Sequence, residues 1–235
     1  MSTREPVGQV VVVVPVRNEE RTLGACITAL RTALDALAAT APGCGAAVTL
    51  VLDRCTDGSA RVAGEAAAAD SRIRTLTVGF GSVGATRAAG VAAALATVPP
   101  DSPAWIACTD ADTLVPTDWL VRFLEFADHG ADAVLGTVEP DRSELGARRH
   151  AAWSARHVRA DGHGHIHGAN LGVRASSYLA VGGFEPLRSG EDVRLVECLR
   201  AAGMDVRASG TLHAVTSART DGRAPDGFAG YLARL

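Results

Sequence analysis

The chain has 235 residues and a mass of 24.2 kDa, a length typical of one domain. Its 23 basic and 26 acidic residues give a net charge of −3, which argues against a nucleic-acid binder that works through a strongly basic surface. None of the basic residues is lysine, which excludes a Walker A loop, a lysine Schiff base and any other lysine-dependent chemistry. A phosphate bound here must be held by arginine, backbone amides or a metal ion.

Short β-branched runs alternate with alanine-rich helical stretches in the first half of the chain. This pattern predicts strands and helices in turn, with strands at 9–14, 47–52, 73–78 and 104–109 and helices at 19–39, 57–70 and 83–96. The valine run that opens the series is typical of a strand buried on both faces of a parallel sheet. We therefore expect an α/β fold with a Rossmann-like, mostly parallel sheet flanked by helices, and a ligand beyond the carboxyl ends of the strands.

The second half is less regular. We expect helices at 118–128, 143–159 and 191–202, and strands at 133–139 and around 170–173. Thr117 is the expected N-cap of the first of these helices. A short strand should follow the last helix, and the chain from Thr216 onward should form a mobile loop with a short terminal helix. Neither an internal repeat nor a linker is evident, so a single domain over residues 1–235 is predicted.

Five scattered cysteines without CxxC spacing favour buried thiols in a reducing compartment over a zinc ribbon or a redox pair. The first apolar run, Val10 to Val14, is too short for a signal peptide or a membrane span. We expect a cytoplasmic protein without an integral membrane segment.

Acidic residues follow two of the predicted strands. Asp53 comes directly after the second strand, and Asp110 and Asp112 come directly after the fourth. Carboxylates that converge on one edge of a sheet suit a metal-assisted phosphate site. An Asp-x-Asp sequence alone is a weak signal, but its position at the end of a buried strand is costly without a partner, which favours a functional role.

Six segments, in this order and spacing, resemble the family 2 glycosyltransferases of GT-A fold: VVVVPVRNEE, VLDRCTDGS, GATRAAG, TDADT, HGANLGVR and SGEDVRL. They span about residues 8–215. The resemblance implies a nucleotide-diphosphate sugar as donor, Mn²⁺ or Mg²⁺ as cofactor and inverting transfer to an acceptor hydroxyl. It also implies a nucleotide-sugar-binding half over about 8–115 and an acceptor-binding half with a mobile C-terminal loop over about 116–235.

The resemblance implies that the donor is bound by residues of the first half, namely Pro15, Val16, Arg17, Glu19, Asp53, Arg87, Asp110 and Ala111. Within this set Asp53 would contact the base and Arg87 would lie near the base and the phosphates. Asp112 would ligate the metal, and Asp110 would contact either the ribose or the metal. The family often has asparagine after the arginine matched by Arg87, whereas this chain has Ala88, so the identity of the nucleotide stays open.

The resemblance assigns the general base to Asp192, with Glu191 in a supporting or acceptor-binding role; the alternative is that the pair only caps a helix. The acceptor-side loop matches His167, Gly168, Ala169 and Asn170. His163, His165 and His167 alternate and so share one face of an extended segment, which favours the wall of a polar groove over a metal site.

Two further features leave alternatives open. His213 is either a third metal ligand or a structural histidine. Arg219 and Arg223 belong either to a plain basic tail or to a loop that closes over the donor and neutralises its leaving diphosphate, a task that no lysine can perform in this chain.

The sequence therefore predicts a metal-dependent inverting glycosyltransferase with a small-molecule donor and an unknown acceptor. We expect no nucleic-acid partner, and a homodimer is the assembly considered. A nucleotidyltransferase is disfavoured because VPVRNEE is not a glycine-rich phosphate loop. A non-catalytic nucleotide-sugar-binding module is disfavoured because Glu191 and Asp192 are both present.

Overall fold

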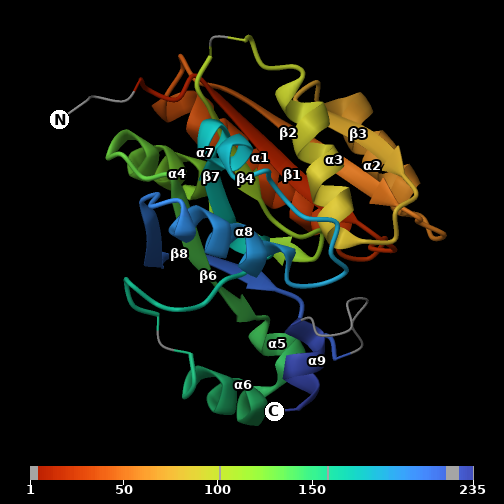
Figure 1. Ribbon diagram of the computed structural model, residues 1–235. Coiled ribbons are helices and arrows are strands. Elements are labelled where there is room, and N and C mark those ends of the chain that lie inside the picture. Colours follow the sequence, from red (N-terminus) through yellow and green to blue (C-terminus); the bar gives the residue numbers. More distant parts are fainter. Residues whose placement is uncertain (1–4, 101, 158, 221–227, 235) are drawn as a thin grey trace.

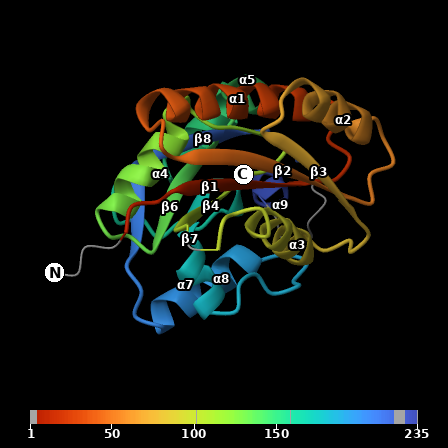
Figure 2. The same ribbon diagram turned by 90° about the horizontal axis from the view of Figure 1, so that it is seen from above.

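A computed structural model of the protein describes residues 5–100, 102–157, 159–220 and 228–234. Its strands form one sheet in the order β3-β2-β1-β4-β7-β6-β8-β5 (Figure 1). Helices α1, α2 and α4 pack on one face of this sheet, and α3, α7 and α8 pack on the other (Figure 2). The predicted α/β class, with a mostly parallel sheet flanked by helices, is confirmed.

The first half of the chain forms the predicted β-α series. Its strands run parallel to one another and are β1 (Gln9–Val16), β2 (Gly45–Asp53), β3 (Ile73–Val78) and β4 (Ala104–Cys108). The connecting helices are α1 (Leu23–Thr40), α2 (Ser59–Ala69) and α3 (Val83–Leu95). The valines of β1 alternate between the two apolar cores, with Val10 and Val12 toward α1 and Val11 and Val13 toward α3. Burial of both faces explains why this strand reads as an unbroken valine run.

Helix α3 lies directly on the sheet because of a glycine. A Cβ at Gly90 would come within 2.6 Å of methyl groups on Val13 and Val51, so no larger residue fits there without moving the helix. This close approach brings the first turns of α3 to the ends of β1 and β2.

Helix α1 has the length and apolar composition of a membrane span, which by itself is weak evidence for one. In the structure Leu23, Ile27, Leu30 and Leu34 of this helix are buried in the core on one face of the sheet. Its apolar face is therefore accounted for by packing within the protein.

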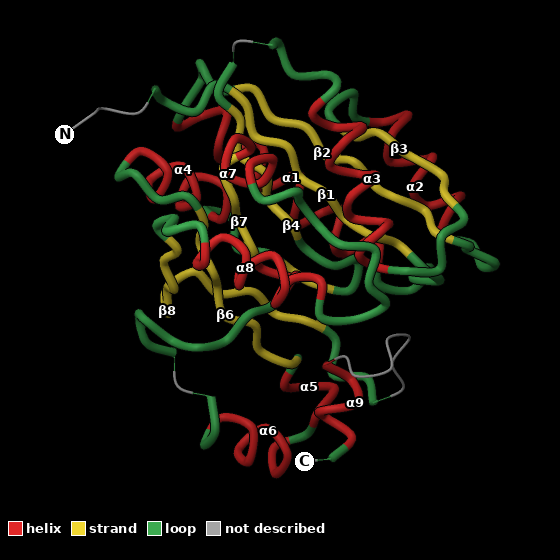
Figure 3. The backbone as a smooth tube through the Cα atoms, viewed as in Figure 1, coloured by secondary structure: helices red, strands yellow, loops and turns green. Residues whose placement is uncertain are grey.

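The second half completes the same sheet (Figure 3). Strand β7 (Leu171–Arg174) pairs antiparallel with both β4 and β6 (Ala133–Pro140). Beyond β6 lie β8 (Val206–Thr216), which is parallel to β6, and the two-residue β5 (Thr113–Leu114). Because one sheet joins both halves, the chain is a single domain.

Several boundaries differ from those expected. The helix predicted at 143–159 is two helices, α5 (Arg142–Leu145) and α6 (Ala147–Ser154), because Gly146 adopts a left-handed conformation with φ of 80°. Asp118, not Thr117, occupies the N-cap position of α4 (Trp119–Asp128). The strand after α8 (Glu191–Ala201) has 11 residues and is not short.

Three short elements complete the fold. The 3₁₀ turn η1 (Gly168–Asn170) precedes β7, α7 (Ala175–Ala180) follows it, and α9 (Phe228–Ala233) lies near the C-terminus. Figure 1 shows α5, α6 and α9 grouped below the sheet, on the side toward which β6 runs. Leu145, Trp153 and Leu232 from these helices share a small apolar cluster.

Candidate active site

A cavity of about 740 Å³ opens beyond the carboxyl ends of β1, β2 and β4. Most of the site residues predicted from the sequence line it, namely Pro15, Val16, Arg17, Glu19, Asp53, Arg87, Asp110, Ala111, Asp112, His167, Gly168, Ala169, Glu191, Asp192 and Arg219. Two predicted residues, Asn170 and His213, are not among the lining residues, and Arg223 lies outside the residues that the structure describes. The strand-end position of the cavity is that expected for an open α/β sheet.

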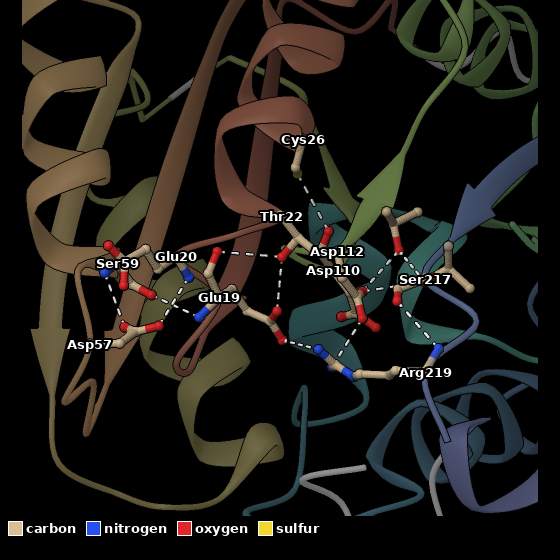
Figure 4. Close-up of polar contacts among 12 residues, drawn as sticks. Glu19, Glu20, Thr22, Cys26, Asp57, Ser59, Asp110, Asp112, Ser217 and Arg219 are labelled. Carbon is tan, nitrogen blue, oxygen red and sulfur yellow. Dashed lines mark hydrogen bonds and ion pairs between the residues drawn. The ribbon is translucent and has the colours of Figure 1, made fainter. Parts of the chain in front are cut away.

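The loops after β1 and β2 are tied together at the mouth of the cavity (Figure 4). Ser59 Oγ accepts a hydrogen bond from the backbone N–H of Glu19 at 2.7 Å, and Asp57 Oδ2 accepts one from that of Glu20 at 3.0 Å. In return, Glu20 Oε2 accepts from the backbone N–H of Gly58 at 3.1 Å. These reciprocal bonds satisfy backbone donors ahead of α1 and at the start of α2, and they hold both loops in one arrangement.

Asp53, at the end of β2, is 3% exposed and joins this strand to α3. Its two carboxylate oxygens accept from the backbone N–H of Gly81 at 3.0 and 2.8 Å, and Oδ2 also accepts from the hydroxyl of Thr86 at 3.0 Å. A carboxylate offers about four lone-pair sites, so one acceptor position remains for a ligand in the cavity.

Arg87 on α3 lies at the centre of the site and forms ion pairs with Asp110 and Glu191. Its side chain and that of Glu191 are almost completely buried, at 4% and 3% exposure. Burial by itself would lower the pKa of Arg87, but the two carboxylates outweigh it and raise the pKa above the usual value. Burial likewise raises the pKa of Glu191, and Arg87 opposes that shift.

Asp112 and Glu19 are bridged by Arg219 (Figure 4). The guanidinium lies 2.9 Å from Asp112 Oδ2 and donates to Glu19 Oε1 at 2.7 Å, and Thr216 donates to Asp112 Oδ1 at 3.2 Å. Burial is the main cause that raises the pKa of Asp112 to about 6; Arg219 lowers it, and the nearby carboxylates of Asp110 and Glu19 raise it further. The position is therefore costly for an anion and attractive for a cation.

Asp192 stands in the first turn of α8, where the helix dipole favours negative charge. Its Oδ2 accepts from the backbone N–H of Gly168 at 2.6 Å, and its Oδ1 accepts from that of Val193 at 2.8 Å. Gly190, just before the helix, has a φ of 78°, a conformation that suits glycine. The carboxylate is thus held in place between α8 and the loop before β7.

Asn170 is in the core and not on the acceptor side, which corrects the expectation for this residue. It is fully buried; its Oδ1 accepts from Trp119 Nε1 at 2.9 Å, and its amide nitrogen donates to the carbonyls of Thr137 and Leu212 at 2.9 and 3.1 Å. All of these partners are protein groups. The side chain joins α4, β6 and β8 and does not reach the cavity.

The acidic partner of His213 is Glu139. Its Nε2 lies 3.4 Å from Glu139 Oε2, which also accepts from Arg159 at 2.6 Å. No group of three or more histidine, cysteine or acidic side chains among the described residues has the arrangement of a metal site. The structure thus does not bring His213 together with Asp110 and Asp112, and it favours the structural alternative for this histidine.

Aromatic side chains that were not predicted as site residues also line the cavity, and they are His157, Phe228 and Tyr231. They lie beside His167, which contacts Phe228 with a centroid distance of 6.0 Å. In the sequence, the alternating histidines at 163, 165 and 167 predicted the wall of a groove in this part of the chain. The contribution of α9, more than 60 residues further along the chain, had no such signal.

We predict that Arg87→Met lowers the free energy of unfolding at pH 7 by about 3–5 kcal/mol, because it leaves the buried carboxylate of Glu191 without its counter-charge and removes the partner of the more exposed Asp110. Chemical denaturation measures the change. Arg61→Met is the matched control, since Arg61 pairs with Glu65 on the surface and its loss should leave stability nearly unchanged. An Arg87 variant as stable as the wild type would contradict a central role for the ion pairs.

We also predict that His167 titrates near pH 4. Burial lowers its pKa to about 4; Asp192 opposes this shift, and the neighbouring histidines add to it. In the unfolded chain a histidine titrates near 6.5, so the stability that a neutral His167 contributes is present above about pH 6.5 and is lost as the pH falls toward 4. NMR of the histidine Cε1–H resonances measures the midpoint, with His167→Gln to assign the signal; a midpoint above 6 would refute the prediction.

Comparison with known proteins supports the predicted class. A family model described as glycosyl transferase family 2 matches residues 11–178. Among solved structures, the mannosyltransferase PcManGT from Pyrobaculum calidifontis, in complex with GDP-Man and Mn²⁺, is 20% identical with a TM-score of 0.63; the match covers 91% of this chain and 58% of that one. S. aureus TarS 1-349 in complex with UDP is 14% identical with a TM-score of 0.63, and the match covers 90% and 61%.

A mycobacterial protein is 17% identical with a TM-score of 0.58, over 96% of this chain and 71% of that one. At these low sequence identities, the similarity of the structures shows a shared fold and nothing more. The chain spans about three-fifths of the length of the PcManGT and TarS 1-349 structures. No curated protein matches the sequence significantly.

Proposed function

We propose that this chain, which belongs to glycosyl transferase family 2, moves a sugar from a nucleoside diphosphate onto an acceptor hydroxyl by metal-dependent, inverting transfer. One observation carries the proposal. A single cavity is lined both by carboxylates at the ends of parallel strands, Asp53, Asp110 and Asp112, and by the carboxylate of Asp192 at the start of a helix. The first group suits a nucleotide and a cation, and the second suits a base for the acceptor.

The donor end is assigned to the loops after β1, β2 and β4. Two proteins of similar fold carry GDP-Man or UDP, and in open α/β sheets ligands bind at this edge. Asp53 retains acceptor capacity for a base, while Arg17 and Arg54 at the cavity wall supply positive charge. Arg87 is occupied by two carboxylates and serves to position them, so its role in the donor end is indirect.

The residues present fit a divalent cation held in part by the substrate. Asp112 and Asp110 offer carboxylate oxygens at the cavity wall, and Asp112 already attracts the positive charge of Arg219. Mg²⁺ is commonly bound by one or two carboxylates together with substrate phosphates, so two protein ligands suffice. When bound, the cation would neutralise charge on the leaving diphosphate.

Arg219 and such a cation compete for the same carboxylate. To accept a cation, Asp112 must release the guanidinium, which then becomes available to the phosphates. This exchange gives the proposed C-terminal loop a physical role: Arg219 neutralises the acidic pocket in one arrangement and the diphosphate in the other.

Asp192 is the proposed base, and the ion pairs explain why it is favoured over Glu191. Glu191 is neutralised by Arg87, whereas Asp192 accepts hydrogen bonds from backbone N–H groups that orient its carboxylate. In the transfer, Asp192 takes the proton of the acceptor hydroxyl as the oxygen bonds to the anomeric carbon. The bond from that carbon to the diphosphate oxygen breaks, and its electron pair leaves with the diphosphate.

Binding of Mn²⁺ alone tests the cation site, with free Mn²⁺ measured by electron paramagnetic resonance. Asp112→Asn should abolish binding, because it removes a charged ligand. Arg219→Gln should tighten binding about fivefold, the equivalent of roughly 1 kcal/mol for a part-buried ion pair. Arg61→Gln is the control, since Arg61 pairs with Glu65 on the surface and is not among the residues that line the cavity. Unchanged Mn²⁺ affinity in Asp112→Asn would disprove the site.

Asp192→Asn tests the base. The substitution keeps the size of the side chain and removes its basicity, so we expect turnover to fall roughly a hundredfold or more while nucleotide affinity stays near that of the wild type. Turnover is followed as nucleoside diphosphate release and affinity by calorimetry. Near-normal turnover in this variant would favour a retaining mechanism. If the wild type and the variant both release nucleoside diphosphate at the same very low rate, a non-catalytic binding module would be favoured.

A further inference from the structure

Five aromatic side chains form a continuous series at one end of the cavity, and we call this series the aromatic wall: His157, His165, His167, Phe228 and Tyr231. His165 stacks on His157 with a centroid distance of 5.1 Å and on His167 at 6.1 Å. Phe228 meets His167 edge-on at 6.0 Å and stacks on Tyr231 at 6.4 Å. Tyr231 returns to His157 at 5.4 Å, which closes the series into a ring of contacts.

The aromatic wall is held in place from behind. Trp153 stacks on His157 with a centroid distance of 4.4 Å and an interplanar angle of 4°, and its carbonyl hydrogen-bonds His157 Nδ1 at 2.8 Å. Trp153 is buried in the apolar cluster of α5, α6 and α9, to which Phe228 and Tyr231 also pack. The ring faces are therefore fixed before any ligand arrives, which lowers the entropic cost of binding.

The aromatic wall adjoins the proposed base. His157, His167, Phe228 and Tyr231 all line the cavity that Asp192 lines. His167 precedes Gly168, whose backbone N–H donates to Asp192, so the wall starts one residue from that contact. A group resting on the wall would therefore lie near the proposed base.

Two histidine rings of the wall, His165 and His167, favour the neutral form at neutral pH. Burial and the neighbouring histidines lower the pKa of both His165 and His167. The carboxylate of Asp192 acts on His167, and Arg87 is already paired with Glu191. An anionic acceptor head is disfavoured there, whereas flat neutral surfaces match the faces of aromatic rings.

We propose that the aromatic wall is an acceptor subsite and that the acceptor carries its hydroxyl on a neutral six-membered ring, which lies against the wall. The proposal rests on the transferase function proposed above, because it takes Asp192 as the base. Two sources share this chemistry, a sugar ring with its apolar C–H face and a phenol. Both would present a hydroxyl beside Asp192.

Binding of small probes, measured by saturation-transfer NMR, tests the subsite. The protein, with MgCl₂ and either UDP or GDP, is titrated in turn with methyl α-D-mannopyranoside, 4-methylphenol and geranyl phosphate. We expect one of the two ring probes to bind, which identifies the source, and geranyl phosphate to bind more weakly. Binding of geranyl phosphate alone would overturn the proposal.

Substitutions locate the binding. Tyr231→Leu and Phe228→Leu keep apolar bulk but remove aromatic rings that line the cavity, and each should weaken the ring probe about three- to tenfold. Phe80→Leu is the matched control, because Phe80 is 51% exposed and is not among the residues that line the cavity. Equal weakening in the control, or none in the wall variants, would overturn the proposal.

NMR of the wild-type protein tests the subsite even if a variant fails to fold. The bound probe should shift the Cε1–H resonances of His157 and His167, and unchanged resonances at saturation would count against the subsite. The two proposals fail separately: nucleotide that binds without any ring probe refutes the subsite alone. A ring probe that binds to the wall in a protein without nucleotide affinity refutes the transferase function alone.

Discussion

The two halves of the site are joined by one buried cation. Arg87 forms ion pairs with Asp110 at the end of β4 and Glu191 at the start of α8, so the proposed donor and acceptor sides share a single guanidinium. A buried carboxylate without a counter-charge is costly, so Glu191 depends on Arg87, whereas Asp110 is also in contact with solvent. Gly168 packs against the same guanidinium, where a Cβ would collide with it. The loop that orients Asp192 thus depends on Arg87 as well.

The second charged group of the site is organised differently. Arg219 is only partly buried, with 32% of its side chain exposed, and its two partners come from the loops after β1 and β4. A guanidinium near solvent can exchange partners at low cost, whereas one enclosed by the core cannot. Because the chain has no lysine, arginine fills two roles in this site. Arg87 is a fixed structural centre, and Arg219 is an exchangeable counter-charge.

Much of the first half could be predicted from the sequence, because hydrophobic periodicity and parallel connections place Asp53, Asp110 and Asp112 at one edge without knowledge of side-chain contacts. The side-chain contacts that could not be predicted depend on distant partners. Asn170 bonds to Trp119 and Leu212, neither of which can be identified from the local sequence. The pairing of Arg219 with Glu19 joins residues 200 positions apart. The break at Gly146 is the exception, since a glycine inside a helical pattern is a visible local signal.

Strand β7 has a consequence for the order in which the protein can fold. It inserts antiparallel between β4 and β6, so β4 obtains its second neighbour only when residue 171 and those after it are available. A nascent chain that ends after β4 exposes the open edge of a hydrophobic strand, and such edges are prone to pair with other chains. The predicted nucleotide-binding half is therefore no independent folding unit. Its contacts of long sequence separation make slow, late completion of the sheet the expected kinetic behaviour.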